Sequence, residues 1–389
     1  MNLNRRNNRV INRQSTTNLF SSPVYGGDKM LLALTFFLIA VGLVMVYSAS
    51  TFVAENKGTP DWFYFIRQTK LLVIGFVIMW LASKIDVAIY HKYAKLFLLI
   101  SVIVMFLQLV TPLGSVIGGT RRWINLGIFS LQTSEVVRCV LVIYVAKILT
   151  DEPEILSRID KRFLNLLMVI GIPIVLTYLQ HDLSGAAMMA VVAGLVLFMG
   201  GLKFYIATIG SVLAGGAVLI VARSSKYQWE RLLGFFGRIF DVSGGDNYQA
   251  LQSFMGFGRG GIFGVGLGQG KQKMLFLPEP HTDFIFSIVG EELGLIGTTV
   301  VLGAFIILTI RAFKICIRQT ERFNFLFGCG LAGSIILYAM VNMSVAIGLL
   351  PVTGLPLPFI SSGGTSLIIS MWSIGVLYNL SKQALPHAG

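Results

Sequence analysis

The chain has 389 residues, of which 55% are hydrophobic and 13% are charged. Soluble domains carry about 25% charged residues, so this composition excludes an ordinary soluble protein and favours spans of about 20 apolar residues in a membrane. The net charge of +13 does not indicate nucleic-acid binding, because the basic residues lie between apolar segments instead of forming one patch.

The N-terminal segment, residues 1–29, is polar and basic and too long for a cleavable signal peptide. We expect a disordered cytoplasmic tail, followed by a first span that serves as an uncleaved anchor. Apolar runs of helical length then predict an all-α polytopic membrane protein with about ten transmembrane helices. Their expected bounds are Met30–Ser50, Phe63–Ser83, Ala94–Thr111, Leu131–Leu149, Phe163–Leu179, Gly185–Gly200, Phe204–Ala222, Asp283–Ile310, Phe323–Leu349 and Ser362–Leu380. One transmembrane domain would cover residues 30–383, with a short cytoplasmic tail over 384–389.

Lysine and arginine set the expected orientation, because the cytoplasmic loops of membrane proteins carry an excess of both. With the N-terminal tail inside, both termini face the cytoplasm. An even number of helices then places four connections of interest outside, at Leu113–Ser130, Gln180–Ser184, Arg223–Thr282 and Pro351–Ser361. The third connection, residues 223–282 between predicted helices seven and eight, is far longer than a usual helix–helix loop and indicates a functional role.

Several charged or aromatic residues gather at the expected outer side, where polar groups near a membrane are expensive and often functional. They are Arg121, Arg122 and Trp123 in GGTRRWINLG, Glu135 and Arg138 in LQTSEVVR, and Asp182 in QHDLSG. Glu135 and Arg138 share a helix face and either form a structural ion pair or contact a ligand. The two adjacent arginines and Trp123 fit lipid headgroups as well as a substrate, and Asp182 fits a loop cap.

The stretch LPEPHTDFIFSIVGEELG begins the eighth predicted helix and crowds acids at its outer mouth. We expect Thr282 or His281 to cap a helix whose first turn contains Asp283. A carboxylate there suits the helix dipole, and it is also placed to serve as a general base. His281 could orient that carboxylate or help to hold a divalent ion. Glu279 lies at the same mouth.

The same helix carries further small and acidic residues. Ser287, Gly290 and Gly294 follow Asp283 on one face, which leaves room for another helix or for a substrate tail. Glu291 and Glu292 lie about 12–14 Å deeper along the helix, so we expect them to hold helices together without sharing chemistry with Asp283.

The glycine-rich run FGRGGIFGVGLGQGKQK lacks the Ser or Thr of a P-loop and no strand precedes it. We expect turns packed on the membrane surface, with Lys271 and Lys273 attracting anionic lipid headgroups. The three cysteines show no disulfide or zinc spacing and are expected to be buried small hydrophobes.

Taken in order, these motifs resemble the SEDS proteins (shape, elongation, division and sporulation), which are bacterial membrane glycosyltransferases. The motifs are GGTRRWINLG, LQTSEVVR, QHDLSGA, FGRGGIFGVGLG, LPEPHTDFIFSIVGEELG and GLLPVTGLPLPFISSGG. The resemblance runs from Asp28 to Leu380. The first predicted span, the glycine-rich run and the basic tail are more similar to the cell-division members than to the elongation members.

The resemblance implies polymerisation of lipid II into β-1,4 glycan strands at the division septum, with release of undecaprenyl diphosphate. Asp283 would be the essential acid. The substrate-contacting set would comprise Arg121, Arg122, Trp123, Glu135, Arg138, Asp182, Lys271, Glu279, His281 and Thr282. It also implies a class B penicillin-binding transpeptidase and other division proteins as partners, and a possible Mg²⁺ or Mn²⁺ ion. A lipid II flippase and a noncatalytic scaffold are the alternatives; clustering of the charged residues on one side disfavours a flippase.

Three of the motifs depart from the family pattern. Thr133 and Arg138 stand where the family usually has proline and lysine, although Glu135 is kept. His181 replaces the proline before Asp182, and Ser362 replaces a tyrosine before two glycines. Arginine at 138 keeps the positive charge but changes the hydrogen-bond geometry.

Overall fold

The computed structural model describes residues 26–117, 120–127, 129–223, 229–230, 233–235, 247–274, 276–278 and 280–383. It confirms the all-α prediction, because a helix lies at each expected span. These helices are α1 (Lys29–Asn56), α2 (Phe63–Ala82), α3 (Val87–Val110), α4 (Thr133–Asp151), α5 (Lys161–Leu179), α6 (Leu183–Met199), α7 (Phe204–Arg223), α10 (Ile285–Ile317), α11 (Arg322–Ala346) and α12 (Gly364–Gln383). The short helix η1 (Pro153–Leu156) and helix α9 (Asn247–Gly260) lie between them.

The largest boundary error is at α3, which begins at Val87 where the sequence predicted Ala94. The Asp86 carboxylate caps this helix by accepting from the amide of Ala88 at 3.0 Å. The cap starts the helix inside a polar stretch, which a search for apolar runs overlooks.

Seven helices in the described ranges are long and apolar enough to cross a membrane, namely α1, α2, α3, α5, α7, α10 and α11. Helix α6 is apolar but shorter. Helices α4 and α12 are buried along most of their length, so other helices surround them in place of lipid. Polar side chains are tolerated in that position because they can bond across helix interfaces. The chain is therefore a multi-pass membrane protein.

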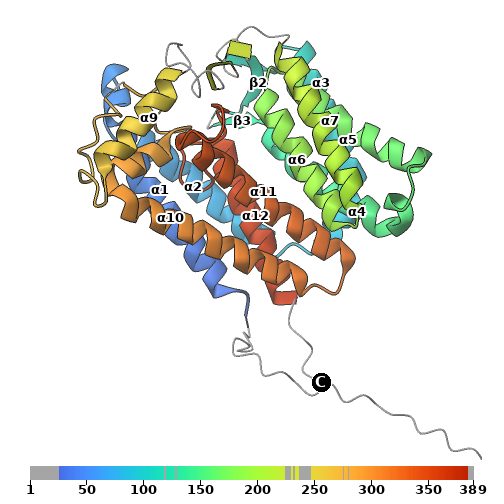
Figure 1. The fold of residues 1–389 in the computed structure, drawn as a ribbon. Coiled ribbons are helices and arrows are strands. Elements are labelled where there is room, and N and C mark those ends of the chain that lie inside the picture. Colours follow the sequence, from blue (N-terminus) through green and yellow to red (C-terminus); the bar gives the residue numbers. More distant parts are fainter. Residues whose placement is uncertain are drawn as a thin grey trace, which may run out of the picture.

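The helices form one bundle in which α11 and α12 lie centrally (Figure 1). Helices α1, α9 and α10 cover one side, and α3, α5, α6 and α7 lie on the other. Helix α7 is the most peripheral of these, since none of its membrane-spanning window is buried.

A small antiparallel sheet joins α3 to α4, and the sequence analysis did not predict it. Its strands are β1 (Ser115–Ile117), β2 (Thr120–Asn125) and β3 (Ser130–Gln132), in the order β1-β2-β3. A turn closes β2 to β3, where the Asn125 side chain accepts from the amide of Gly127 at 2.9 Å. The sheet was missed because such short strands carry too little alternation to be recognised beside long apolar runs. It carries Arg122 and Trp123 to the start of α4.

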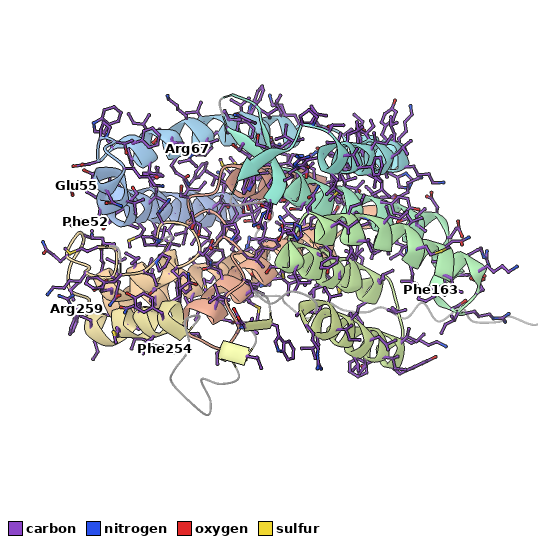
Figure 2. The ribbon with its side chains drawn as sticks, turned by 90° about the horizontal axis from the view of Figure 1, so that it is seen from above. Phe52, Glu55, Arg67, Phe163, Phe254 and Arg259 are labelled. Atoms are coloured by element: carbon purple, nitrogen blue, oxygen red, sulfur yellow. The ribbon has the colours of Figure 1, made fainter. Side chains whose placement is uncertain are left out.

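Both described chain ends lie at the same end of the bundle. The amide of Asp28, before α1, donates to the Ser381 hydroxyl of α12 at 2.9 Å, and Arg311 pairs with the Asp28 carboxylate at 2.6 Å. The N-terminal tail that was expected to be disordered lies outside the described residues except for 26–29, and the C-terminal tail over 384–389 lies outside them entirely. In the view from above, Glu55, Arg67 and Arg259 lie at one end of the bundle and Phe163 at the other (Figure 2).

Helix α10 is broken at Gly294, whose φ of 66° is a left-handed conformation that favours glycine. The loop after α9 fills the break. The amides of Val265 and Gly266 donate to the carbonyls of Glu291 and Glu292 at 3.0 and 3.1 Å, and the amide of Leu295 donates to a loop carbonyl. Backbone groups released by the break are thus satisfied within the protein, as a membrane environment requires.

Candidate active site

A cavity of about 1020 Å³ opens at the end of the bundle opposite the chain ends. Its wall comes from β2, the first turns of α4, α6 and α12, the last turns of α7, and the segment before α10. Of the residues selected from the sequence, it brings together Arg122, Trp123, Glu135, Asp182, Thr282 and Asp283. Segments from Thr120 to Ser366 therefore meet at one concave, partly apolar site, which is the usual form of a ligand pocket.

Asp283 lies on this wall, half-buried, in the turn that precedes α10. The prediction that it occupies the first helical turn is wrong, because Phe284 is the N-cap and Ile285 is the first helical residue. The carbonyl groups of His281 and Thr282 accept from Ser362 and Ser361, which belong to the connection before α12. These carbonyls are therefore not available to helical amides, and the helix begins later.

Asp182 caps α6 and also anchors Arg122. One carboxylate oxygen accepts from the amide of Gly185 at 2.9 Å, and the other accepts from the Gln132 side chain at 3.0 Å and the Ser134 hydroxyl at 3.4 Å. A guanidinium nitrogen of Arg122 lies 3.7 Å from Asp182. The loop-cap interpretation of Asp182 is therefore confirmed. The same carboxylate lies on the cavity wall and holds a cation there, while a contact with substrate stays a prediction.

His181, beside Asp182, also lines the cavity and has a φ of 61°. A proline ring fixes φ near −65°, so the proline usual in the resembled family could not adopt this conformation. The substitution noted in the sequence therefore changes the local backbone while leaving the carboxylate in the cavity.

Glu135 and Arg138 form a buried ion pair at 2.9 Å, with side chains 4% and 6% exposed. Glu135 faces the cavity, whereas Arg138 lies behind it with its guanidinium 3.8 Å above the Tyr338 ring. Burial of a charge is tolerated when a partner compensates it, so Arg138 and Tyr338 hold Glu135 at the wall. Arg138 is therefore a structural ion-pair partner, which is one of the two interpretations given by the sequence. Glu135 both forms this ion pair and faces the cavity.

Besides Arg138, three of the selected residues in the described part of the chain are not on the cavity wall. Arg121 and Lys271 are exposed, and the amide of Lys271 donates to the Glu291 carboxylate at 2.8 Å. His281 is buried behind the segment that carries Asp283. Glu279 lies outside the described residues.

The ring of His281 contacts the Tyr64 ring, with centroids 4.7 Å apart. Burial, together with the smaller effects of the Lys57 and Arg67 charges, lowers the pKa of His281 from 6.5 to about 4. The imidazole is therefore neutral at physiological pH and contributes packing, not charge, behind Asp283.

Glu291 and Glu292 hold the loop after α9 against α10, as expected of structural acids. Both are fully buried, and Glu292 pairs with Lys273 at 2.6 Å while it accepts from the Ser48 hydroxyl at 2.7 Å. Glu291 accepts from the amides of Lys271 and Gln272. The prediction that Lys273 attracts lipid headgroups is wrong, because its side chain is 2% exposed and bonded inside the protein.

Gly256 and Gly260 of α9 lie against Ser287 and Gly290 of α10, where an added Cβ would collide with the facing helix. The small-residue face predicted on α10 therefore accommodates another helix.

Several residues of the site were missed in the sequence. Gln132 and the hydroxyl residues Thr120, Ser362 and Thr365 line the cavity, while Tyr338 lies behind it. Tyr338 and Asn342 stand one helical turn apart in the apolar α11, and polar groups at that depth are a recognisable signal of function. The others stand in polar connections, where such residues are common and carry no such signal.

The described residues contain no group of three or more His, Cys, Asp and Glu side chains that could hold a metal ion. Glu135, Asp182 and Asp283 are the carboxylates on the cavity wall. Mg²⁺ is usually held by one or two carboxylates together with waters and substrate phosphates. The Mg²⁺ or Mn²⁺ ion therefore stays a prediction, and no catalytic step is assigned to one.

Comparison with known proteins gives a consistent result. Residues 28–385 match the family described as cell cycle protein, which comprises FtsW, RodA and SpoVE. A probable peptidoglycan glycosyltransferase FtsW from Coxiella burnetii is 36% identical over 92% of this chain and 96% of the relative. Stage V sporulation protein E of Bacillus subtilis is 33% identical over 92% of this chain and 97% of the relative.

The fold also matches solved structures. One chain, from a study of structural coordination of polymerization and crosslinking by a peptidoglycan synthase complex, superposes with a TM-score of 0.77 at 26% identity. The match covers 92% of this chain and 99% of that one. RodA of Thermus thermophilus superposes with a TM-score of 0.69 at 26% identity over 93% of this chain and 99% of the other.

Proposed function

This chain belongs to the FtsW, RodA and SpoVE family of cell cycle proteins, and from that membership we propose that it is a peptidoglycan glycosyltransferase that polymerises lipid II. The product is a β-1,4-linked glycan strand, and undecaprenyl diphosphate is released. The observation that carries the proposal is one cavity whose wall holds both an acid, Asp283, and a cation, Arg122. Sugar transfer from a lipid diphosphate needs both groups.

Asp283 acts as the general base. Its carboxylate takes the proton of the acceptor sugar's 4-hydroxyl as that oxygen forms a bond to the anomeric carbon of the donor. The bond from that carbon to the diphosphate oxygen breaks, and its electron pair leaves with the diphosphate. Attack from the face opposite an α-linked leaving group gives a β-linked product, so one base is sufficient.

Arg122 stabilises the negative charge that develops on the departing diphosphate. Its guanidinium lies at the wall with side-chain exposure of 32%, while its partner Asp182 is 6% exposed. A protein-bound carboxylate thus orients the cation before substrate binds, which lowers the cost of reorganisation during the reaction. Arg138, which the resemblance also placed among the substrate-contacting residues, lies behind Glu135 and forms an ion pair with it, so it is not assigned this role.

Apolar residues complete the wall and suit a lipid-linked substrate. They include Met188, Val218, Ala222, Val341, Leu350, Val352 and Leu355. Val218 and Ala222 belong to α7, the most exposed of the helices, so the cavity borders the lipid-facing side of the bundle. This placement supports a substrate whose sugar enters the cavity while its isoprenoid tail stays among the helices.

The resemblance to the cell-division members leads us to propose a site of action at the division septum. There the cavity would face outward and both termini the cytoplasm. A class B penicillin-binding transpeptidase and other division proteins would be the partners. A solved complex that coordinates polymerization with crosslinking supports the first partner by its fold similarity. The division role itself is supported by curated relatives named FtsW.

The test uses purified full-length protein with and without the transpeptidase, supplied with labelled lipid II. We expect glycan polymer from the wild type with its partner, and none above background from Asp283→Asn. Polymer at the wild-type rate from a folded, partner-bound Asp283→Asn would contradict the role of Asp283. Translocation of lipid II across vesicles without polymer would indicate a flippase. Normal cell division with substituted Asp283 would indicate a scaffold.

A further inference from the structure

We propose that Asn342 is a positioning residue for Asp283, acting through the main chain on either side of the catalytic carboxylate. The inference rests on the proposed function, since it concerns the geometry of the base in that reaction. Asn342 lies within α11, is 1% exposed, and does not itself line the cavity. It therefore acts through neighbouring groups and does not contact the sugar.

The amide of Asn342 joins the two segments that flank the carboxylate. Its nitrogen donates to the Asp283 carbonyl at 2.9 Å and to the Leu355 carbonyl at 2.8 Å. The first carbonyl belongs to the turn before α10, and the second belongs to the connection between α11 and α12. A single side chain therefore fixes the separation of these two segments.

The spacing between those segments matters because the carboxylate lies between them. At Gly354, next to Leu355, an added Cβ would lie 3.5 Å from an Asp283 carboxylate oxygen. Gly354 has a φ of 73°, a conformation that few other residues adopt. The connection thus passes close to the reacting group, and a small shift of either segment changes the space left for the acceptor hydroxyl.

Energetics also favour a role for this side chain. A polar residue inside an apolar helix is costly unless it is bonded, and such residues in membrane proteins are often functional. Removal of the amide leaves two backbone carbonyls without this donor, so both segments relax toward other donors. A displacement of about 1 Å at a reacting group can lower a rate about 100-fold.

The test is Asn342→Leu, which keeps the approximate side-chain shape and removes the donor. The matched control is Asn379→Leu. Asn379 is likewise a buried helical asparagine, 8% exposed, but it donates to the carbonyl of Ile85 at the chain-end side of the bundle. Both proteins are purified with the transpeptidase, and kcat, KM for lipid II and melting temperature are measured.

We expect Asn342→Leu to lower kcat about 10- to 100-fold with KM changed less than about 3-fold, and Asn379→Leu to keep wild-type kcat. Melting temperatures should fall by similar amounts in the two variants. Wild-type kcat in folded Asn342→Leu, or an equal loss of kcat in Asn379→Leu, would overturn the proposal. If Asn342→Leu does not fold, Asn342→Ser applies the same criteria, because its hydroxyl is too short to reach both carbonyls. An inactive wild-type complex would refute the proposed function itself, which separates the two failures.

Discussion

Two acidic regions of one short stretch, Asp283 and the pair Glu291 and Glu292, have opposite environments although they lie close together in the sequence. Asp283 is half-buried at a cavity, and the main chain around it is held by α11 and the connection before α12. The two glutamates are fully buried, and their carboxylates accept from a lysine, a serine and loop amides.

The difference shows how the protein can keep a carboxylate accessible for the proposed reaction. At Asp283 the backbone is constrained while the carboxylate is presented to a space that a substrate can enter. At the glutamates the carboxylates themselves are the constraint, since each joins α10 to the loop after α9. Preorganisation of a catalytic group requires the first arrangement, and stability of a broken membrane helix requires the second.

We expect the variant Asp283→Asn to distinguish the two regions most clearly. Loss of the base should lower polymerisation about 10²- to 10⁴-fold, because a general base typically contributes that factor. The melting temperature should be nearly unchanged, because asparagine keeps the size of the side chain and the bond from Asn342 to the carbonyl of residue 283 remains. Polymerisation and thermal unfolding of the same purified complex provide both measurements. A large loss of stability would mean that Asp283 is structural like the glutamates.

Lys273→Met is expected to give the reverse pattern. Breaking one side of a buried ion pair costs about 3–5 kcal/mol, because the remaining charge stays buried without compensation. Lys273 and Glu292 are 2% and 0% exposed, so this estimate applies to them. Thermal unfolding should show the loss, and adding Glu292→Gln should restore part of it. Additive losses in the double variant would show that the two charges are not coupled.

The helices were predictable because apolar runs of membrane length have one physical explanation. The errors fell where polar chemistry set the boundary, as at Asp86, whose cap starts α3 early. The sheet that carries Arg122 was missed, and so was helix α9. Neither has the long apolar pattern that identifies a span.

The sequence predicted which residues belong to the candidate site better than it predicted how these residues are arranged. Asp182, Glu135 and Asp283 were found because charge near a membrane is rare. Their roles required contacts: Arg138 lies behind Glu135, and Lys273 is buried against Glu292. The Glu135–Arg138 pair follows from its i,i+3 spacing on α4, but the spacing does not show which of the two faces the cavity. The pairing of Lys273 with Glu292 does not follow from the sequence, because a loop and a broken helix bring them together. Asn342 was recognisable in the sequence as a polar residue inside an apolar helix. The two carbonyl groups to which it donates could not be identified in this way.

Arg122→Ala tests whether the cation at the wall serves the same reaction as Asp283. We expect kcat to fall about 10-fold or more, because a charge that stabilises the leaving group is lost. Arg121→Ala is the matched control, as this neighbour is exposed and does not line the cavity. Its kcat should stay within about 2-fold of the wild type. Equal effects of the two substitutions would indicate a general contribution of positive charge, such as attraction of anionic lipid.

His281 provides the smallest expected effect and probes the support behind Asp283. Its pKa is about 4 in the folded protein, against 6.5 for an unperturbed histidine, mainly because of burial. The unfolded chain therefore binds the proton more readily between these values. The stability that this neutral side chain contributes is complete above pH 6.5 and is lost as the pH falls toward 4. At pH 5.5 the loss relative to pH 8 should be about 1 kcal/mol.

Melting temperatures across this range should show a slope in the wild type that is reduced in His281→Gln. An unchanged slope would show that other groups cause the pH dependence. His281 would then contribute only through its packing against Tyr64.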